Sequence, residues 1–398
     1  MATVAGTVVH PMDFSLVDLC AEIQAGRITP SQSVAACFER IHLLNPALNA
    51  LVALAEEAAT ATADLQTRQL AEGKFVGPLA GVPFAVKDLE DTIGLPTSYG
   101  TTVFKDNVAT EDSVQVSRLK AAGAIVVGKT NTPIFGSTMF CKNLAFGATG
   151  NPWDVTRTSG GSSGGSASAV AARMMPIATA ADGGGSIRIP ACFVGAFGLK
   201  PSFGRVPMTE GRQFGMLKFV SVASKRRRRR CCMHLSISLT AALLHASIFS
   251  LFINTCGDYQ IDCVHFGPIT RTVQDSALFL DIVSGYHPHD PGSLPRAETT
   301  FMKSISTPLN RRLKIKWSPD LGYVQKVDRR VTAQCEAALK VLEGLGHTVE
   351  ETSLALPDMG VKWGVAMGLQ EFLMVEDALK GREAEMETWV SVPAACCY

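Results

Sequence analysis

The sequence predicts an α/β protein with a mixed or mostly parallel sheet that helices cover. From residue 81 onward, short apolar runs alternate with helical patterns, which is the element order of such folds. The chain also holds 35 glycines, and this number suits the many tight turns between strands and helices. A length of 398 residues allows a large buried core.

The N-terminal part is predicted to be helical. Apolar residues recur at helical spacing within residues 13–26, where a glycine ends the pattern. Thr29 is suited to cap a second helix, with Pro30 as its first residue. A third helix, rich in alanine, glutamate and glutamine, is expected at about residues 55–72.

The alternating part follows. Buried strands are expected at 81–88, 124–130 and 176–182, and a later strand at 312–317. Helices are expected at 112–123, 164–174, 270–283 and 327–346. The stretch GAIVVGKT, residues 123–130, also matches a phosphate-loop pattern. We favour a plain strand, because the residues between its glycines have strand character and Pro133 discourages the helix that a phosphate loop needs.

Charge and cysteine content argue against several classes of protein. The six consecutive basic residues 225–230 supply more positive charge than the net charge of +1, so the rest of the chain is net negative. A nucleic-acid partner is therefore not predicted. Eleven cysteines contain no CxxC pair, which argues against a disulfide framework or a zinc site and favours a reducing compartment. The N-terminus lacks a secretory signal, so we expect a cytoplasmic protein.

The region densest in glycine and serine has no histidine, since none lies between residues 43 and 233. A nucleophilic serine in GGGSIRIP, residues 183–190, would therefore need a distant histidine or another base. A buried lysine can serve, although lowering its pKa from about 10.4 to about 7 costs roughly 5 kcal/mol. Lys87 follows the buried strand GVPFAV and is the candidate for this base. The alternative is that Lys87 has no catalytic function and extends from the strand end to solvent.

Three segments together resemble the amidase signature family: GVPFAVKD, NPWDVTRTSGGSSGGSASAVAA and ADGGGSIRIPACFVGAFGLKPSFGRVP, in this order. GPITRTVQDSALFLDIV resembles the segment that follows them in that family. The resemblance runs from about residue 13 to 208, resumes at about 265 and weakens past 300. It implies the amidase signature fold, with a central mixed β-sheet covered by helices on both faces. It also implies a single domain over 1–398 with its signature core at about 81–208.

The resemblance implies a Ser–Ser–Lys triad. Ser186 is the implied nucleophile, Ser162 the bridging serine after a cis Gly161–Ser162 peptide bond, and Lys87 the base. The implied oxyanion hole consists of the N–H groups of Gly183, Gly184, Gly185 and Ser186. The implied supporting residues are Ser163, Asp182 and Arg188, of which the last is expected to brace the loop.

The implied function is hydrolysis of a small-molecule amide to an acid and an amine or ammonia, through an acyl-enzyme on Ser186. It requires neither a metal nor a cofactor. Part of the substrate pocket is expected within 136–147, while the substrate and the oligomeric state stay open. The catalytic subunit of a glutamyl-tRNA(Gln) amidotransferase is an alternative, but that class usually reads D-T-G-G-S-I-R-Q-P, and this chain has Gly183 and Ile189 in place of the threonine and glutamine.

Residues 224–263 break the pattern of the surrounding sequence. The basic run precedes an apolar stretch, 235–254, that is long enough to span a bilayer. We interpret the segment as foreign to the fold, for example an intron read as coding sequence; a surface insertion that binds a membrane is the alternative. The abrupt ending VSVPAACCY suggests that the family's usual C-terminal elements are missing. An inactive product of a disrupted amidase gene is therefore a further alternative.

Overall fold

The computed structural model describes residues 3–4, 7–208, 264–354, 356–358 and 382. They belong to two compact units that divide between Met302 and Lys303. The predicted insertion at 224–263 and the VSVPAACCY ending lie outside the described residues. The single domain over 1–398 stays a prediction.

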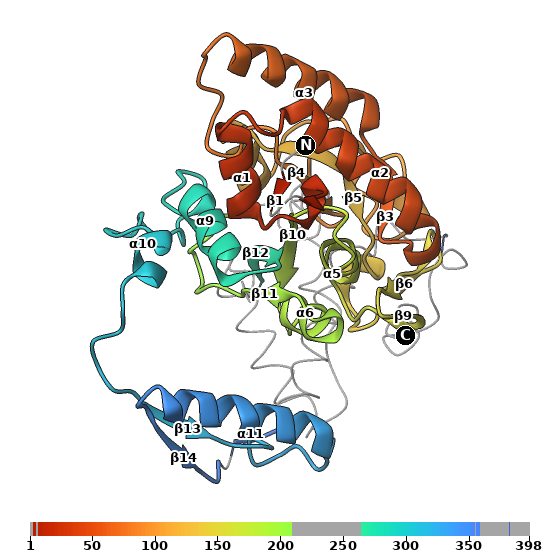
Figure 1. Ribbon diagram of the computed structural model, residues 1–398. Coiled ribbons are helices and arrows are strands. Elements are labelled where there is room, and N and C mark those ends of the chain that lie inside the picture. The colour runs from red at the N-terminus through yellow and green to blue at the C-terminus, as the bar shows by residue number, and fades with distance from the viewer. Residues whose placement is uncertain (1–2, 5–6, 209–263, 355, 359–381, 383–398) are drawn as a thin grey trace. The chain divides into compact units, whose positions relative to one another are not determined.

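The first unit is built on a six-stranded mixed sheet with the strand order β11-β12-β10-β4-β5-β3 (Figure 1). The adjacent strands β10, β4 and β5 run parallel, and the other neighbours pair antiparallel. Its strands are β3 (Leu51–Leu54), β4 (Pro83–Lys87), β5 (Ile125–Thr130), β10 (Ile177–Asp182), β11 (Phe197–Gly198) and β12 (His265–Thr270). The predicted mixed sheet is confirmed.

Helices flank this sheet. They are α1 (Leu16–Gln24), α2 (Pro30–Leu48), α3 (Glu56–Ala71), α4 (Val114–Ala121), α5 (Gly164–Ala171), α6 (Arg188–Val194) and α9 (Val273–Val283). Short 3-10 turns and two-stranded pairs complete the unit: η1 (Pro11–Asp13), η2 (Thr102–Phe104), η3 (Ile134–Gly136), β1 (Thr3–Val4) with β2 (Thr7–Val8), β6 (Lys142–Asn143) with β7 (Gly147–Ala148), and β8 (Gly150–Asn151) with β9 (Asp154–Thr158).

The second helix shows how local sequence sets an element boundary. The Thr29 side chain accepts the N–H of Gln32, and the Gln32 side chain accepts the N–H of Thr29, which is a reciprocal capping box. Pro30 occupies the first helical position, where its missing N–H costs no hydrogen bond. The predicted cap is confirmed.

The central strands carry the core and end at a common edge. Every residue of β4 and of β10 is buried, as their continuous apolar runs predict. The parallel register pairs Phe84 with Ile177 and Ala85 with Ala178. The carboxyl ends of these neighbours therefore lie side by side, which brings Lys87 next to the end of β10.

The strand β12 was not predicted by the sequence pattern, because HFGPIT contains a glycine and a proline that favour a turn. It nevertheless pairs with β10 over five residues and with β11 on its other side. A Cβ on Gly267 would lie 2.4 Å from the carbonyl oxygen of Leu199, so a larger residue does not fit there.

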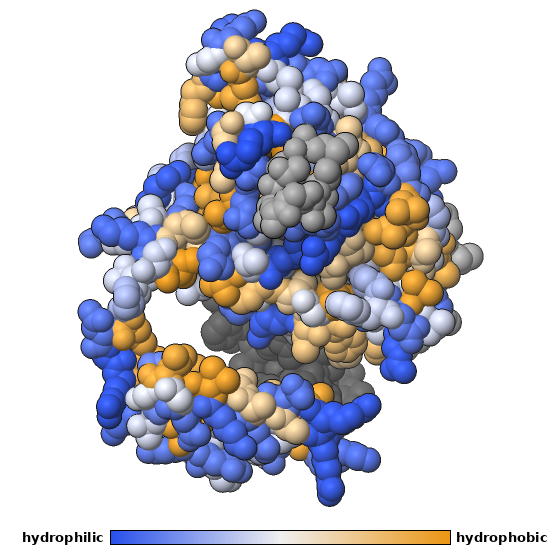
Figure 2. Space-filling model, in the orientation of Figure 1, coloured by the Kyte–Doolittle hydropathy of each residue, from blue (hydrophilic) through white to orange (hydrophobic). Residues whose placement is uncertain are grey.

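The second unit contains the parallel strands β13 (Lys314–Trp317) and β14 (Thr348–Glu351) and the helix α11 (Arg329–Gly344). The short helix α10 (Phe301–Ser306) crosses the division between the units. Apolar residues gather along α11 (Figure 2), where Val331 and Val341 are exposed, as is Leu345 directly after the helix. Among the described residues, no helix combines the length and the apolar character that a membrane span needs.

Candidate active site

Lys87 is the last residue of β4, and its side chain is 1% exposed. Its Nζ donates to the Ser162 Oγ at 2.7 Å and to the main-chain oxygen of Ala181 at 3.4 Å. Burial lowers the pKa of Lys87 from 10.5 to about 7. Cys141, Asp182 and Glu90 act in the opposite direction, but burial outweighs them. A substantial fraction of this amine is therefore neutral near pH 7.

Ser162 lies just before α5 and is 2% exposed. The peptide bond that precedes it, Gly161–Ser162, is cis. The contact between Lys87 and Ser162 can serve in either direction, because an ammonium donates to the hydroxyl oxygen and a neutral amine can accept the hydroxyl proton. A Cβ on Gly136 would lie 3.3 Å from this oxygen, so the η3 turn closes over the serine.

The glycines that open α5 allow its close approach to neighbouring segments. A Cβ on Gly164 would lie 2.3 Å from the Cys141 Cβ, and one on Gly165 would lie 2.3 Å from the Asn131 nitrogen. The prediction that these glycines serve close backbone packing, in place of a flexible linker, is confirmed.

Ser163 joins the helix to the turn that contains Ser186. Its N–H donates to the main-chain oxygen of Ser186 at 3.1 Å. Its hydroxyl donates to the main-chain oxygen of Ala181 at 3.3 Å. The structure thus brings Lys87, Ser162, Ser163 and the Ser186 turn together, from the end of β4, the start of α5 and the turn that follows β10.

Asp182 organises the turn itself. Its carboxylate accepts the N–H groups of Gly185 at 2.7 Å and Ile187 at 3.1 Å. The Arg188 guanidinium donates to both oxygens of the same carboxylate, at 2.8 and 2.9 Å. Burial raises the pKa of Asp182, but these donors outweigh it and hold the pKa below its usual value. Asp182 is therefore ionised, and its contact with Arg188 links the two ends of the turn.

The sequence places the N–H of Gly185 in the oxyanion hole, whereas in the structure this N–H donates to Asp182. Gly185 has a φ of +120°, and a Cβ there would lie 2.6 Å from the Ile189 Cδ1. The N–H groups of Gly183, Gly184 and Ser186 have no acceptor in the part of the chain that the structure describes. The Ser186 side chain is partly exposed and has no hydrogen-bond partner among the same residues.

A histidine from β12 also reaches this turn. Because His265 pairs with Asp182 across the sheet, its Nδ1 lies 3.3 Å from the main-chain oxygen of Asp182. Its ring also meets the Phe203 ring edge-on. The sequence gives no sign of this neighbour, since His265 lies 83 positions after Asp182 in the chain.

A second buried lysine, Lys129 of β5, was not singled out as a functional residue from the sequence. Its Nζ donates to the Thr97 hydroxyl at 2.8 Å and to the main-chain oxygen of Glu90, and it lies 3.6 Å from the Asp88 carboxylate. Burial lowers the pKa of Lys129, and the neighbouring acids oppose this effect. This lysine is fully buried within a strand, so the phosphate-loop interpretation of 123–130 is wrong and the strand is confirmed.

The chain matches a family model and several curated proteins. A family model described as amidase matches residues 32–218 and 250–390. An acylamidase of Rhodococcus erythropolis is 36% identical over 339 residues, which is 85% of this chain and 61% of the relative. A glutamyl-tRNA(Gln) amidotransferase component from Alkaliphilus metalliredigens is 32% identical over 350 residues, 88% of this chain and 62% of that relative.

The structure is also similar to solved ones. A bacterial aryl acylamidase of the amidase signature family superposes with a TM-score of 0.77 and 27% identity, over 95% of this chain and 71% of the solved chain. The chain spans about three fifths of the length of the curated relatives it matches.

Proposed function

We propose, from the premise that this chain belongs to the amidase family, that it hydrolyses the C–N bond of a carboxylic amide through an acyl-enzyme on Ser186. The observation that carries the proposal is the buried Lys87 amine, with a pKa of about 7, at 2.7 Å from the Ser162 hydroxyl. Ser163, the next residue, holds the main chain of Ser186.

In the proposed reaction, neutral Lys87 takes the proton of Ser162, and Ser162 takes that of Ser186. The Ser186 oxygen then bonds to the amide carbon, and the carbonyl π electrons move to oxygen. The N–H groups of Gly183, Gly184 and Ser186 stabilise this oxyanion in the proposal. The relay returns a proton to the amide nitrogen as the C–N bond breaks.

Water completes the cycle. It attacks the ester on Ser186 while the same relay accepts its proton, and the acid leaves as Ser186 regains its hydrogen. Lysine suits this sequence of steps because a neutral amine takes a proton in the first step and its ammonium supplies one to the leaving nitrogen. The proposed reaction uses no cofactor.

We propose an apolar acyl or aryl group for the substrate. The main chain of residues 138–140 packs against Gly161, where a Cβ would lie 2.9 Å from the Met139 carbonyl carbon. The Met139 and Phe140 side chains are about half exposed, so this segment offers apolar surface that a substrate could cover. These residues lie within the predicted pocket segment 136–147.

The test combines labelling and turnover. The purified full chain is incubated with a fluorophosphonate and, separately, with a panel of alkyl and aryl amides without tRNA or partner proteins. We expect Ser186→Ala to abolish labelling and turnover, while Ser202→Ala, at an exposed serine, leaves both intact. Undiminished labelling of the Ser186 variant would contradict the nucleophile. Turnover only with added amidotransferase partners would favour the amidotransferase alternative.

A further inference from the structure

Asp88 follows Lys87 directly, and the proposed reaction does not use its carboxyl group. The residue is 2% exposed, and its N–H donates to the main-chain oxygen of Thr130 in β5 at 3.0 Å. The Asp88 side chain accepts the Ser98 N–H at 3.1 Å on one oxygen and the Ser98 hydroxyl on the other. Because a carboxyl group this deeply buried needs such partners, these bonds tie Ser98 to the end of β4.

The segment 98–100 makes further bonds to the same residue. The Ser98 hydroxyl oxygen accepts the Gly100 N–H at 3.2 Å, which leaves the hydroxyl hydrogen for Asp88. The Tyr99 N–H donates to the main-chain oxygen of Asp88 at 3.1 Å. Asp88 therefore holds this segment through its side chain and its main chain together.

Tyr99 connects this segment with the η3 turn. Its main-chain oxygen accepts the Phe135 N–H at 2.8 Å. Tyr99 and Phe135 have φ angles of 54° and 52°, in the left-handed region that residues other than glycine rarely adopt. The rings of both residues meet the Phe104 ring edge-on, with centroid distances of 5.7 and 6.4 Å. Such backbone angles persist where the surroundings hold them, so the two turns fix each other.

The η3 turn lies directly against Ser162. A Cβ on Gly136 would lie 3.3 Å from the Ser162 Oγ and 2.6 Å from the Leu89 Cδ1, so only a glycine fits between these two side chains. The Lys87 Nζ lies 2.7 Å from the same serine oxygen. A continuous series of hydrogen bonds and contacts therefore runs from Asp88, the neighbour of the proposed base, to the turn that meets the bridging serine.

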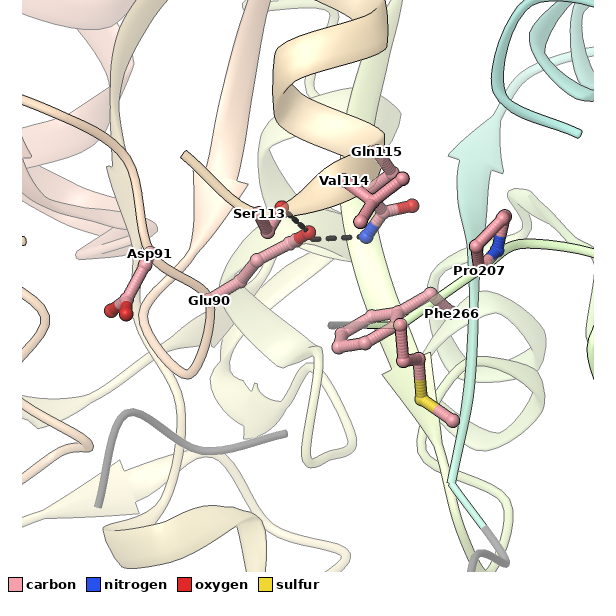
Figure 3. Close-up of a pocket in the computed structure, with 8 residues that line it drawn as sticks. Glu90, Asp91, Ser113, Val114, Gln115, Pro207 and Phe266 are labelled. Carbon is pink, nitrogen blue, oxygen red and sulfur yellow. Dashed lines mark hydrogen bonds between the residues drawn. The ribbon is translucent and has the colours of Figure 1, made fainter. Parts of the chain in front are cut away.

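Glu90, two residues further on, is held from a different side. Its carboxyl group accepts the Ser113 hydroxyl at 2.5 Å and the Gln115 amide at 2.8 Å, both from the start of α4 (Figure 3). The Ser113 oxygen also accepts a backbone N–H of α4. Ser113 on Glu90 thus repeats the chemistry of Ser98 on Asp88, but its contacts lead to α4 and not to the η3 turn. Ser113 is therefore a matched control for Ser98.

We propose that Asp88 and Ser98 are positioning residues, which hold the η3 turn against Ser162 through Tyr99 and so keep the Ser162 hydroxyl within reach of Lys87. The proposal rests on the proposed function in that Lys87 and Ser162 form the proton relay. In this role the two residues act through the turn and do not touch the reacting atoms. Their loss should therefore slow the chemical step and leave substrate binding nearly unchanged.

The first test compares Ser98→Ala with Ser113→Ala in the full chain. Each variant removes one hydroxyl from a buried carboxyl group of the same loop, and both should lose stability. We expect Ser98→Ala to lower kcat about tenfold with KM within about twofold of the parent, while Ser113→Ala leaves both constants within about twofold. An equal kcat in the two variants would overturn the positioning effect.

The second test needs no turnover, so it separates this proposal from the proposed function. Urea unfolding of Lys87→Met, Ser162→Ala and the double variant gives the coupling energy between the two side chains. We expect Ser98→Ala to remove at least half of this coupling and Ser113→Ala to leave it unchanged. A reduced coupling in a protein that hydrolyses no amide would support the positioning and contradict the hydrolysis. A coupling that Ser98→Ala leaves intact would contradict the positioning.

Gly136 supplies a variant at the other end of this series of contacts. Gly136→Ala adds a Cβ that meets Leu89 and Ser162 at a φ of +75°, and we expect kcat to fall about tenfold or more. Gly73→Ala is the control, because Gly73 has nearly the same φ, +73°, and open space around the added Cβ, so its kcat should match that of the parent. Equal kcat values in the two alanine variants would overturn the contact of the turn with Ser162, including the case in which Ser98→Ala does not fold.

Discussion

Replacement of Lys87 by methionine should stabilise the folded chain in a manner that depends on pH. Methionine matches the length of the lysine stem and carries no charge, so it removes the group that burial penalises. The folded protein releases the Lys87 proton above about pH 7, whereas the unfolded chain keeps it up to about pH 10.5. Between these values the unfolded state binds more protons, so the parent gains stability as the pH rises.

The size of the effect follows from this pKa difference. A shift from 10.5 to about 7 corresponds to about 5 kcal/mol, at about 1.36 kcal/mol for each pH unit. Below pH 7 both states are protonated and the parent carries the full penalty. Above pH 10.5 neither state is protonated and the penalty disappears. The loss of the hydrogen bond to Ser162 also changes the free energy of unfolding, by an amount that is constant between pH 7 and pH 10.5.

Urea unfolding at pH 7 and pH 9.5 measures the difference directly. We subtract the free energy of unfolding of the parent from that of Lys87→Met. This difference should be about 3 kcal/mol smaller at pH 9.5 than at pH 7, because the parent gains stability as the pH rises. Lys142→Met, at an exposed lysine, is the control and should give the same difference at both pH values. An identical difference for Lys87→Met at the two pH values would refute the lowered pKa and, with it, the lysine base.

Two further predictions concern the rate. The value of kcat/KM should rise with pH through an apparent pKa near 7. Lys87→Arg should have little activity, because a guanidinium stays protonated, and near-native turnover of this variant between pH 5 and 9 would contradict the prediction. Gly185→Ala should lower kcat tenfold or more, since the added Cβ meets Ile189 at a positive φ that costs about 1–3 kcal/mol. Gly344→Ala, where a Cβ meets open space within a helix, should leave kcat unchanged and raise stability by about 0.5–1 kcal/mol.

The sheet and the place of Lys87 could be predicted because local signals agree with long-range pairing. A continuous apolar run ending in VKD and another ending in AAD predict buried parallel strands, and parallel neighbours end at the same sheet edge. That rule brings Lys87 and Asp182 together without knowledge of the register. The assignment of roles to Ser162 and Ser186 depends on family resemblance, since a serine between glycines carries no local sign of its partner.

The parts that could not be predicted depend on contacts between distant segments. The strand β12 forms because β10 offers it a complete edge, which outweighs the turn preference of its glycine and proline. The hydrogen bond from Gly185 to Asp182 depends on how the turn folds back, and glycine spacing does not specify the acceptor. The hydrogen bond from the Lys87 N–H to the Thr179 hydroxyl likewise has no sequence motif, because it joins neighbouring strands of the sheet.

The two buried lysines show where the sequence stops being informative. Lys87 and Lys129 both stand at or near the end of a buried apolar strand, and hydropathy treats them alike. Their contacts in the folded sheet distinguish the two lysines. Lys129 lies 3.6 Å from the Asp88 carboxylate, and this acid opposes the lowering of the pKa of Lys129 by burial. Lys87 faces a serine hydroxyl and has no carboxylate within ion-pair distance among the described residues, so burial can expel its proton. The two lysines are therefore distinguished by what lies opposite them and not by their own strands.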